Sequence, residues 1–321
     1  MKIAFLIFNH RGQEQLLRLL ATLRRQLPDS PLVVHHDKFR AELSASALES
    51  LGNTHLLTSD KPIVWGDLSL VEACWRSLTW MTANIEFDWL VVLSAQDYPI
   101  KPLAGLGKYI ASTGAGALVD ATPIGELPTA GLRKITRRRF LYQYGPAREL
   151  WPTARISERI WVNLRQSMAL FADVLNNSQQ YFKIYRYPDR MPWRFGRRAS
   201  STPFSPDWPC WFGSVWFGLS EAAARYINTF VQNNPEYVAY YERTICPDES
   251  VTATIICNAP GIRVERIALH FVRWTRPQSG HPDILGIADM PELLASPAFF
   301  ARKFDAAIDS DVLDRLDELI Q

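Results

Sequence analysis

The chain begins with Lys2-Ile3-Ala4-Phe5-Leu6-Ile7-Phe8, and every residue of this run after Lys2 is apolar. A continuous apolar run of this length is typical of a β-strand that is covered on both faces, as in a parallel sheet. A strand with one solvated face would instead alternate apolar and polar residues. The run therefore predicts a buried strand whose sheet has helices on both sides.

The segments that follow alternate between helical and strand patterns. Apolar residues at helical spacing predict a helix at 13–27, and a more polar segment predicts another at 41–51. Ser69-Leu70-Val71-Glu72 fits a capping box, with Ser69 as the N-cap of a helix that runs to about Ala83. We predict an α/β fold with a doubly wound, mostly parallel sheet flanked by helices, from the strands expected at 31–34, 54–57 and 88–93.

The middle of the chain, about residues 122–209, breaks this rhythm. It holds a basic stretch at 133–139, a predicted helix at 157–175, and a loop rich in Pro, Arg and aromatic residues at 185–211. We interpret this part as an insertion on one face of a single domain that spans residues 1–321. Strand and helix patterns then resume, at 213–219, 221–231, 248–258, 264–274 and 311–320.

The composition bounds the class of protein. The chain has 321 residues, of which 47% are hydrophobic, and its formal net charge is +2, so charge alone predicts neither a nucleic-acid nor a membrane partner. The four cysteines include no Cys-x-x-Cys pair, which argues against a zinc or redox motif. We find no signal peptide and no apolar run of the ~20 residues that a membrane helix needs, and expect a cytoplasmic protein.

Single acids follow two of the predicted strands. Asp37 and Asp97 each stand where a strand ends, and such ends face the ligand crevice of an open α/β sheet. Aspartates also cap turns and helices at these places, and the sequence leaves both interpretations open. There is no Gly-x-Gly-x-x-Gly or Gly-Lys-Ser/Thr motif, so a dehydrogenase or P-loop enzyme is disfavoured. The Asp-x-Asp at 309–311 begins the last helix and is interpreted as a cap rather than a metal site.

Two features of the last third carry the chemistry. Glu249 lies in Cys246-Pro247-Asp248-Glu249, at the start of an otherwise apolar helix, where burial would raise its pKa toward the range of a general base. Arg302 and Lys303 lie between aromatic residues, which a solvated face explains poorly and phosphate binding explains well. A salt bridge to Asp305 or Asp309 is the structural alternative for these two cations. The basic stretch 133–139 is interpreted as a solvated strand or loop face, with contact to nucleic acid or anionic lipid as the weaker alternative.

Together these motifs resemble the core-2/I-branching N-acetylglucosaminyltransferase and peptide O-xylosyltransferase family, glycosyltransferase family 14. The resemblance runs along most of the chain outside residues 122–209. It rests on the order and spacing of His35-His36-Asp37, Trp65-Gly66-Asp67-Leu68-Ser69, residues 93–101, Gly213-Ser214-Val215-Trp216-Phe217, Pro247-Asp248-Glu249 and residues 296–305.

The resemblance implies a GT-A-like fold and an inverting transfer of N-acetylglucosamine or xylose from a UDP-sugar to a hydroxyl, without a metal or other cofactor. Glu249 then corresponds to the catalytic base and Lys303 to the diphosphate-binding lysine. A second diphosphate cation, an arginine upstream of the lysine, has no match in register, and Arg273 and Arg276 are the nearest candidates. Arg302 is kept as a further donor-binding residue, although the resemblance assigns its neighbour Lys303. The remaining expected contacts are Phe8, His10 and Asp37 around the uridine, Asp97 near the donor sugar, and Trp65 and Trp216 at the sugar or acceptor.

The expected partners are a UDP-sugar and a glycan or other hydroxyl acceptor, with no nucleic acid. Because the membrane anchor of Golgi members is absent, the resemblance favours a bacterial-type enzyme, with contact at a membrane surface left open. The alternative function is a non-catalytic carbohydrate- or nucleotide-binding protein on the same fold. The middle of the chain differs from the animal members, so no acceptor residue can be carried over from them.

Overall fold

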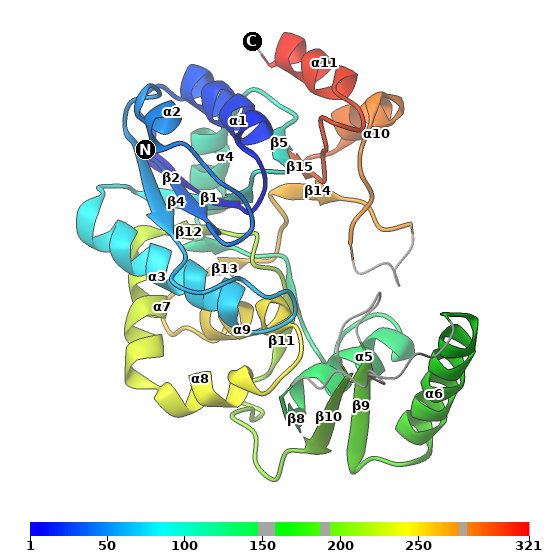
Figure 1. The fold of residues 1–321 in the computed structure, drawn as a ribbon. Coiled ribbons are helices and arrows are strands. Elements are labelled where there is room, and N and C mark those ends of the chain that lie inside the picture. Colours follow the sequence, from blue (N-terminus) through cyan, green and yellow to red (C-terminus); the bar gives the residue numbers. More distant parts are fainter. Residues whose placement is uncertain (147–157, 187–192, 276–280, 321) are drawn as a thin grey trace.

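The computed structural model describes residues 1–146, 158–186, 193–275 and 281–320. A seven-stranded sheet forms its centre (Figure 1). β1 (Ile3–Asn9) pairs in parallel with β2 (Leu32–His36) and β4 (Trp89–Ser94), β2 pairs in parallel with β3 (Thr54–Thr58), and β12 (Gly218–Ser220) runs antiparallel to both of its neighbours. The predicted mostly parallel sheet is therefore confirmed. In spatial order the strands are β13 (Val264–Glu265), β6 (Ala117–Leu118), β12 (Gly218–Ser220), β4 (Trp89–Ser94), β1 (Ile3–Asn9), β2 (Leu32–His36) and β3 (Thr54–Thr58).

The apolar run in β1 is buried along its whole length because helices cover both faces of the sheet. Ile3, Phe5 and Ile7 belong to one hydrophobic core, and Ala4, Leu6 and Phe8 belong to the other. This confirms the doubly wound arrangement. The first core also takes side chains from α1 (Gln13–Gln26), α2 (Ala45–Glu49), α4 (Leu106–Thr113), α10 (Met290–Ala295) and α11 (Asp311–Leu319), and the second from α3 (Ser69–Asn84), α7 (Glu221–Asn233), α8 (Pro235–Glu242) and α9 (Val251–Cys257).

The start of α3 differs from the predicted capping box. Leu68 is the N-cap, and Ser69 is the first residue of the helix. The Ser69 hydroxyl instead donates to Asp67 Oδ1 at 2.5 Å and accepts from the Val64 amide at 2.8 Å. The prediction of a capping box is wrong because the serine closes the turn that precedes the helix. The helix itself is where the sequence placed it.

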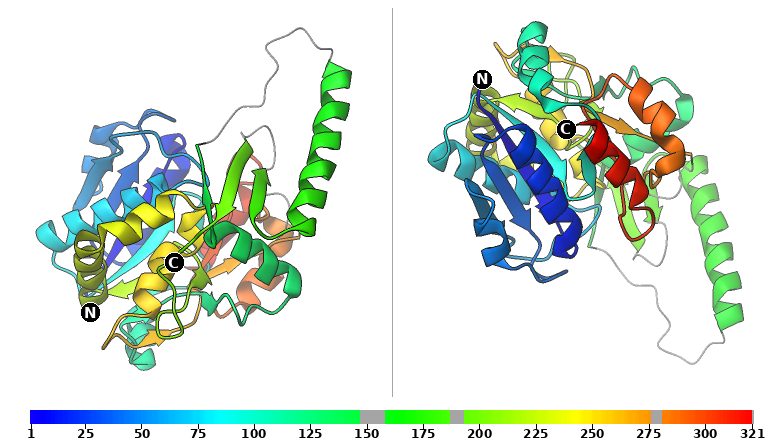
Figure 2. Two further views of the ribbon diagram at one scale, coloured as in Figure 1. Left: turned by 90° about the horizontal axis from the view of Figure 1, so that it is seen from below. Right: turned by 90° about the horizontal axis from the view of Figure 1, so that it is seen from above.

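The segment between residues 122 and 209 forms a unit of its own beside the central sheet. It contains α5 (Ala130–Phe140), α6 (Glu158–Ser178) and a three-stranded antiparallel sheet of β8 (Tyr142–Tyr144), β10 (Trp193–Arg198) and β9 (Phe182–Arg186). Figure 2 shows α6 at the outer edge of the molecule. The two ends of the segment meet, because β7 (Ala121–Pro123) pairs with β11 (Trp211–Gly213).

Two predictions within this segment are wrong. Residues 133–139 are helical and belong to α5, in which the Thr129 side chain accepts from the Leu132 amide at 3.1 Å and caps the helix. Thr136 and Phe140 lie one turn apart and are buried, which gives the helix an inner face despite its many cations. The predicted loop at 185–211 includes strand β10 among its described residues.

A small second sheet joins segments that are far apart in the sequence. β5 (Asp97–Pro99) follows β4 directly and pairs with β15 (Phe300–Arg302), which pairs with β14 (His270–Val272). Arg302 is the register partner of Asp97. The helical turns are η1 (Leu103–Gly105), η2 (Pro247–Glu249) and η3 (Ile287–Asp289). In the described part of the chain, no helix has the length and hydropathy to span a membrane.

Candidate active site

The carboxyl ends of the central parallel strands gather polar residues at one edge of the sheet. β1 ends at Asn9, β2 at His36 and β4 at Ser94. His10, Asp37 and Asp97 follow these ends and therefore lie along the same edge. In doubly wound sheets this edge is where ligands bind.

Asp97 is the centre of a buried ionic cluster. Its carboxylate is fully buried and accepts two hydrogen bonds from Ser94, one from the amide at 2.8 Å and one from the hydroxyl at 2.6 Å. Arg302 Nε lies 3.1 Å from Oδ1, and His270 Nε2 lies 3.4 Å from Oδ2. Burial opposes ionisation, but Arg302, His270 and Ser94 outweigh it and hold the pKa of Asp97 below its usual range.

Arg302 is held between Asp97 and an aromatic ring. Its Cζ atom lies 4.1 Å from the centroid of the Trp216 ring, which is the geometry of a cation–π contact. The Trp216 ring in turn lies beside His270, with the centroids 6.4 Å apart. The structure thus brings three of the predicted site residues, Asp97, Trp216 and Arg302, into one cluster.

Glu249 lies in η2, immediately before α9. The turn is entered through Cys246, whose φ is 49°, and the Cys246 amide donates to Gly66 O at 3.0 Å. The Glu249 carboxylate accepts a hydrogen bond from the Arg139 guanidinium of α5, and Tyr185 of β9 adjoins the same arginine. The Glu249 side chain is 31% exposed, so one side of it remains open to solvent or a ligand.

Asp248 and Glu249 form a pair of adjacent, largely desolvated carboxyl groups. Burial raises the pKa of Glu249 against the pull of Arg139, and burial together with repulsion from Glu249 raises the pKa of Asp248. Asp248 also interacts electrostatically with Arg302. The turn that holds Glu249 is therefore next to the Asp97 cluster.

The inserted segment supports this turn. The Tyr144 amide donates to Arg243 O at 2.7 Å, and Arg194 Nη1 donates to Thr244 O at 3.1 Å. The rings of Tyr142 and Tyr144 pack against Ile245 and Cys246. Strands β8 and β10 thus fix the backbone just before Glu249.

Lys303 lies in a group of cations at the ends of β1 and β2. His10, Arg11 and Arg302 are near enough to interact with it electrostatically. Burial, followed by Arg11 and Arg302, lowers the pKa of Lys303. Arg11 is paired with Asp305 at 2.5 Å, but within the described residues no carboxylate lies within 4.0 Å of the Lys303 ammonium. A half-buried cation without a carboxylate partner suits a phosphate.

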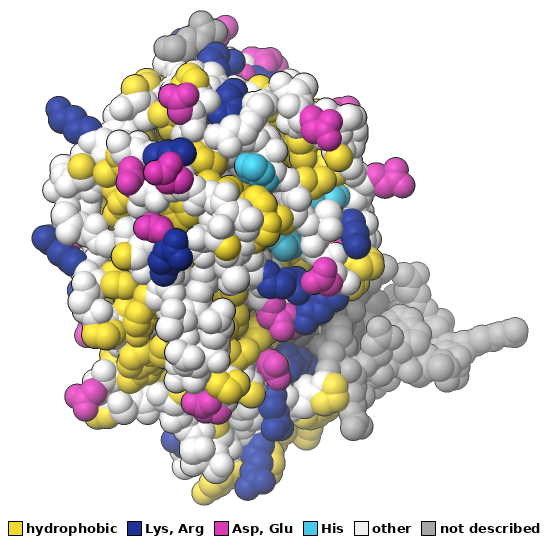
Figure 3. Space-filling model, turned by 90° about the vertical axis from the view of Figure 1, so that its left-hand side faces the viewer, with side chains coloured by type: hydrophobic (Ala, Val, Ile, Leu, Met, Phe, Trp, Pro, Cys, Tyr) yellow, Lys and Arg dark blue, Asp and Glu magenta, His cyan; other side chains and the backbone are white. Residues whose placement is uncertain are grey.

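His10 adds a neutral donor or acceptor to this group. Desolvation by the neighbouring residues lowers the pKa of His10 to about 4, and the positive charges of Arg11 and Lys303 act in the same direction. The imidazole is therefore uncharged at neutral pH. Arg40, which lies 4.0 Å from Asp37, contributes to the same positive field. In Figure 3, Lys and Arg side chains form a band down one side of the face shown, with a few acidic side chains between them.

Other predicted residues have structural contacts. Both oxygens of Asp37 accept backbone amides, from Phe39 at 3.1 Å and from Ile63 at 3.0 Å, so this acid closes a turn. Phe8 is buried against His35, with the ring centroids 5.6 Å apart. Trp65 is 37% exposed, and its ring lies 6.0 Å from that of His281.

Arg273 and Arg276 are the two candidates for the second diphosphate cation. The Arg273 guanidinium is surrounded by the carboxylates of Asp283, Asp289 and Glu292, at 3.2, 2.5 and 3.1 Å. Its charge is therefore already compensated within the protein. Arg276 lies outside the described residues.

Four residues of the site were missed from the sequence. Arg11 and Arg40 come within three residues of predicted positions, so their closeness to strand ends was the available signal. Arg139 and His270 reach the site only through tertiary packing. Nothing in the sequence connects them to Glu249 or Asp97.

Metal ligands do not gather in the described residues, where no group of three or more His, Cys, Asp or Glu is arranged to hold an ion. Asp309 Oδ1 accepts the amides of Asp311 and Val312, at 3.0 and 3.3 Å. Asp309 therefore binds amides of the first turn of α11 from the position before the N-cap, which is Ser310.

Comparison with known proteins gives a family match along most of the chain. The model of the family described as Core-2/I-Branching enzyme matches residues 3–294. Beta-glucuronosyltransferase GlcAT14A from Arabidopsis thaliana is 24% identical over 337 residues, which cover 99% of this chain and 64% of that protein. Xylosyltransferase 1 from Canis lupus familiaris is 23% identical over 341 residues, covering 98% of this chain and 30% of that protein. The chain thus spans less than two thirds of the length of these relatives.

Among solved structures, glucosyl-3-phosphoglycerate synthase from Mycobacterium tuberculosis is similar over 36% of this chain and 42% of that chain, with 15% identity and a TM-score of 0.27. The 2-C-methyl-D-erythritol 4-phosphate cytidylyltransferase from Thermus thermophilus is similar over 92% of this chain and 98% of that chain, with 13% identity and a TM-score of 0.34.

The Asp97 cluster makes a prediction about stability. Asp97→Asn leaves Arg302 buried without a carboxylate, so we expect a loss of about 3–5 kcal/mol in the free energy of unfolding at pH 7, measured with urea. Because the pKa of Asp97 is lower in the folded protein than in the unfolded chain, its contribution is complete above the unfolded pKa of about 3.9. The difference between wild type and variant should therefore stay constant from neutral pH down to the unfolded pKa, shrink as the pH falls from there toward the lower, folded pKa, and be lost below the folded pKa.

Asp314→Asn is the control for this prediction. Asp314 pairs with Arg18 at 2.6 Å, but its side chain is 63% exposed, so removing its charge should cost less than about 1 kcal/mol. Equal effects of the two substitutions would contradict the assignment of Asp97 as the buried centre of the site.

Proposed function

This chain belongs to the Core-2/I-Branching enzyme family, and we propose that it transfers a sugar from a UDP-sugar to a hydroxyl of a glycan or other acceptor, with inversion and without a metal ion. The observation that carries this proposal is the Glu249 carboxylate, whose pKa is raised and which lies beside the Asp97, Arg302 and Trp216 cluster. A carboxylate with a raised pKa is the stronger base and suits proton abstraction from an acceptor hydroxyl.

The proposed reaction is a single displacement. The acceptor hydroxyl attacks the anomeric carbon while Glu249 takes its proton, and the bond from the anomeric carbon to the β-phosphate oxygen breaks. UDP departs with the electron pair of that bond. One base on one side of the sugar is enough for inversion, and the sequence and structure offer one such carboxylate with an open side.

The negative charge that develops on UDP requires stabilisation. The Lys303 ammonium has the required charge and has no carboxylate of its own within 4.0 Å among the described residues. Arg11 extends the same positive field and replaces Arg273 as our candidate for the second cation, because Arg11 has one carboxylate partner, Asp305, and a side chain that is 45% exposed, whereas three carboxylates surround Arg273. Positive side chains placed in this way perform the role that a metal ion has in other nucleotide-sugar enzymes.

We propose three candidates for the donor sugar. The names of the similar proteins add glucuronic acid to the N-acetylglucosamine and xylose expected from the resemblance. Arg302, which stacks on the Trp216 ring, and the buried Asp97 would lie next to the donor sugar. Trp216 offers an aromatic face to a sugar, and the Arg302 side chain remains 15% exposed.

Glu249→Gln tests the proposed base. It removes the proton acceptor but retains the shape and the contact with Arg139, so UDP affinity should stay within about threefold while turnover falls roughly 10²–10⁴-fold. The assay measures UDP release from UDP-N-acetylglucosamine, UDP-xylose and UDP-glucuronic acid, each with and without EDTA. Glu242→Gln, at the exposed end of α8, is the control and should have no effect. Unchanged turnover in Glu249→Gln would contradict the assignment, and UDP binding without turnover of any donor would support the non-catalytic alternative.

Arg139→Gln tests the electrostatics of the base. The guanidinium lowers the pKa of Glu249, so its removal should raise that pKa further. Activity requires the ionised carboxylate and falls as the pH drops through its pKa, so the acid limb of the kcat/KM profile should move to higher pH. Arg197→Gln, an exposed residue of β10, removes the same charge without a contact to Glu249 and should leave the limb in place. A shift of the limb to lower pH in Arg139→Gln would contradict the proposed role of Glu249.

Lys303→Gln tests the diphosphate site. Loss of one charge-assisted hydrogen bond should weaken UDP binding by roughly 10–100-fold, measured by titration calorimetry in EDTA. Lys108→Gln, on the exposed surface of α4, removes the same charge and should leave the affinity unchanged. If wild-type protein binds UDP only when a divalent cation is added, the metal-independent mechanism is wrong.

A further inference from the structure

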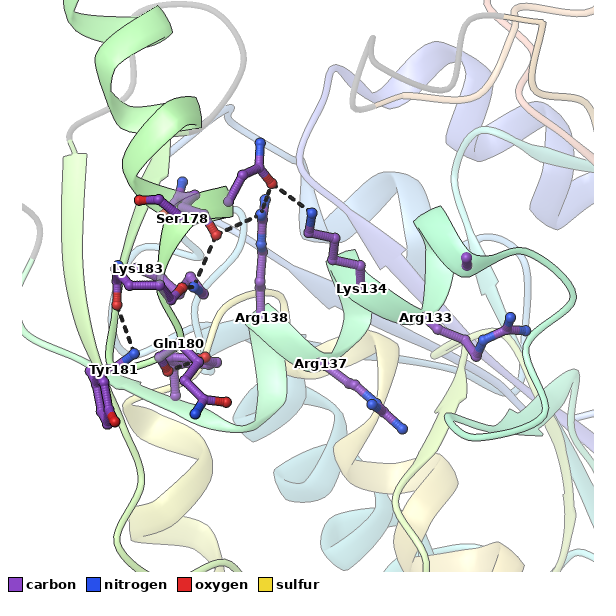
Figure 4. A pocket seen from close by; sticks show the side chains of 13 residues that line it. Arg133, Lys134, Arg137, Arg138, Ser178, Gln180, Tyr181 and Lys183 are labelled. Atoms are coloured by element: carbon purple, nitrogen blue, oxygen red, sulfur yellow. Dashed lines mark hydrogen bonds between the residues drawn. The ribbon is translucent and has the colours of Figure 1, made fainter.

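An open pocket lies between α5, the end of α6 and the start of β9, and neither Asp97 nor Lys303 lines it (Figure 4). Its volume is about 700 Å³, within the range of about 300–1,000 Å³ that is usual for ligand sites. No Asp or Glu occurs among the described residues that line it. Five cations do line it, and they are Arg133, Lys134, Arg137, Arg138 and Lys183.

Neutral groups accept hydrogen bonds from these cations but do not compensate their charge, and Arg138 Nε is buried without a hydrogen-bond partner among the described residues. Lys134 Nζ donates to Asn177 Oδ1 at 2.6 Å, and Arg138 donates to the same oxygen at 2.7 Å. Lys183 Nζ donates to the carbonyl of Asn176 at 3.0 Å. In the described part of the chain, no carboxylate lies within 4.0 Å of any of the five. Figure 4 shows Lys134 and Arg138 converging on the end of α6.

Such a concentration of uncompensated charge is costly in a nearly neutral protein. The chain has 35 Lys and Arg against 33 Asp and Glu, so acids were available to pair with these residues. Burial, followed by Arg138 and Lys134, lowers the pKa of Lys183, which records the mutual repulsion. An anion bound in the pocket would relieve that repulsion.

The pocket is adjacent to the proposed base. Arg138 faces the pocket, and the next residue, Arg139, contacts Glu249. Consecutive residues of a helix point about 100° apart, so the pocket and the base lie on neighbouring faces of α5, within roughly one helix diameter of 10–12 Å. A ligand of a few sugar units can span that distance.

We propose that this pocket binds an anionic segment of the acceptor glycan, a saccharide with carboxylate or sulfate groups, and so presents one of its hydroxyls to Glu249. The part that concerns the acceptor depends on the proposed function. Cations bind the acidic groups, and the side-chain NH2 groups of Asn177 and Gln180 lie among them as donors to sugar hydroxyls. A glycan is favoured over nucleic acid because binding of single strands requires a basic groove that follows several nucleotides, whereas these cations line a single pocket.

The test compares two charge-matched double variants of the full chain. Lys134→Gln with Arg137→Gln removes two exposed cations of the pocket, and Gln retains an N–H donor for Asn177. Lys101→Gln with Lys108→Gln removes the same charge from the region of α4. The probes are tetragalacturonate and a sulfated heparin tetrasaccharide, with neutral maltotetraose as reference, measured by calorimetry at low ionic strength without a donor.

The wild type and the α4 variant should bind at least one anionic probe, and the pocket variant should lose roughly tenfold or more in affinity, since two charged contacts are removed. The pocket variant should also unfold at the same temperature as the wild type or higher, because its repulsion is reduced. With UDP-sugar present, KM for the anionic acceptor should rise in the pocket variant while kcat stays unchanged. If the wild type and both double variants bind the probes as expected but none of them turns over a UDP-sugar, the transferase function would be contradicted and the pocket proposal would stand.

Three results would overturn the pocket proposal. The wild type could bind neither anionic probe more tightly than maltotetraose. Both double variants could lose affinity equally, which would indicate only the effect of net charge. The pocket substitutions could leave the probes bound but abolish binding to phosphatidylglycerol vesicles or to a single-stranded DNA oligonucleotide, which would assign the pocket to a lipid surface or to nucleic acid.

Discussion

The buried ion pair of Asp97 and Arg302 joins the end of the central strand β4 to the C-terminal strand β15. Asp97 follows the central strand β4 directly, and Arg302 comes from β15, about two hundred residues later in the chain. Taking such a pair out of water costs several kcal/mol per ion, which must be offset by contacts. Ser94 supplies two hydrogen bonds and Trp216 supplies its ring, so the pair is stable only when the central sheet and the second sheet are both in place. Lys303 follows Arg302 and is positioned by the same contact.

The opposite side of the site depends on the inserted segment. Glu249 lies in a short turn whose preceding backbone is held by β8 and β10, and its carboxylate is held by Arg139 of α5. The described part of the insertion therefore positions both the backbone of this turn and the Glu249 carboxylate.

The sequence predicted the central fold well because a strand that is buried on both faces, such as Ile3–Asn9, has an almost continuous run of apolar residues. Single-residue details were less accessible. Ser69 matched a capping pattern, yet Asp67 competed for its hydroxyl. The cations of α5 concealed a helix whose inner face is only Thr136 and Phe140. Motif spacing selected Glu249, Asp97 and Lys303 as candidates, whereas the contact of Arg139 with Glu249 spans 110 positions and depends on packing that no local pattern encodes.

Charge compensation separates structural from ligand-binding cations in this molecule. Arg18 and Arg273 are each surrounded by carboxylates, and these ion pairs fix α11 and the region after β14. Lys303 and the cations that line the α5–α6 pocket lack such partners among the described residues. In a chain of net charge +2, the partly buried Lys303 and the acid-free group of five pocket cations are two places where the described residues leave charge uncompensated, and they differ in this from isolated exposed cations such as Lys108. A diphosphate at one place and an acidic saccharide at the other would complete both, with Glu249 between them.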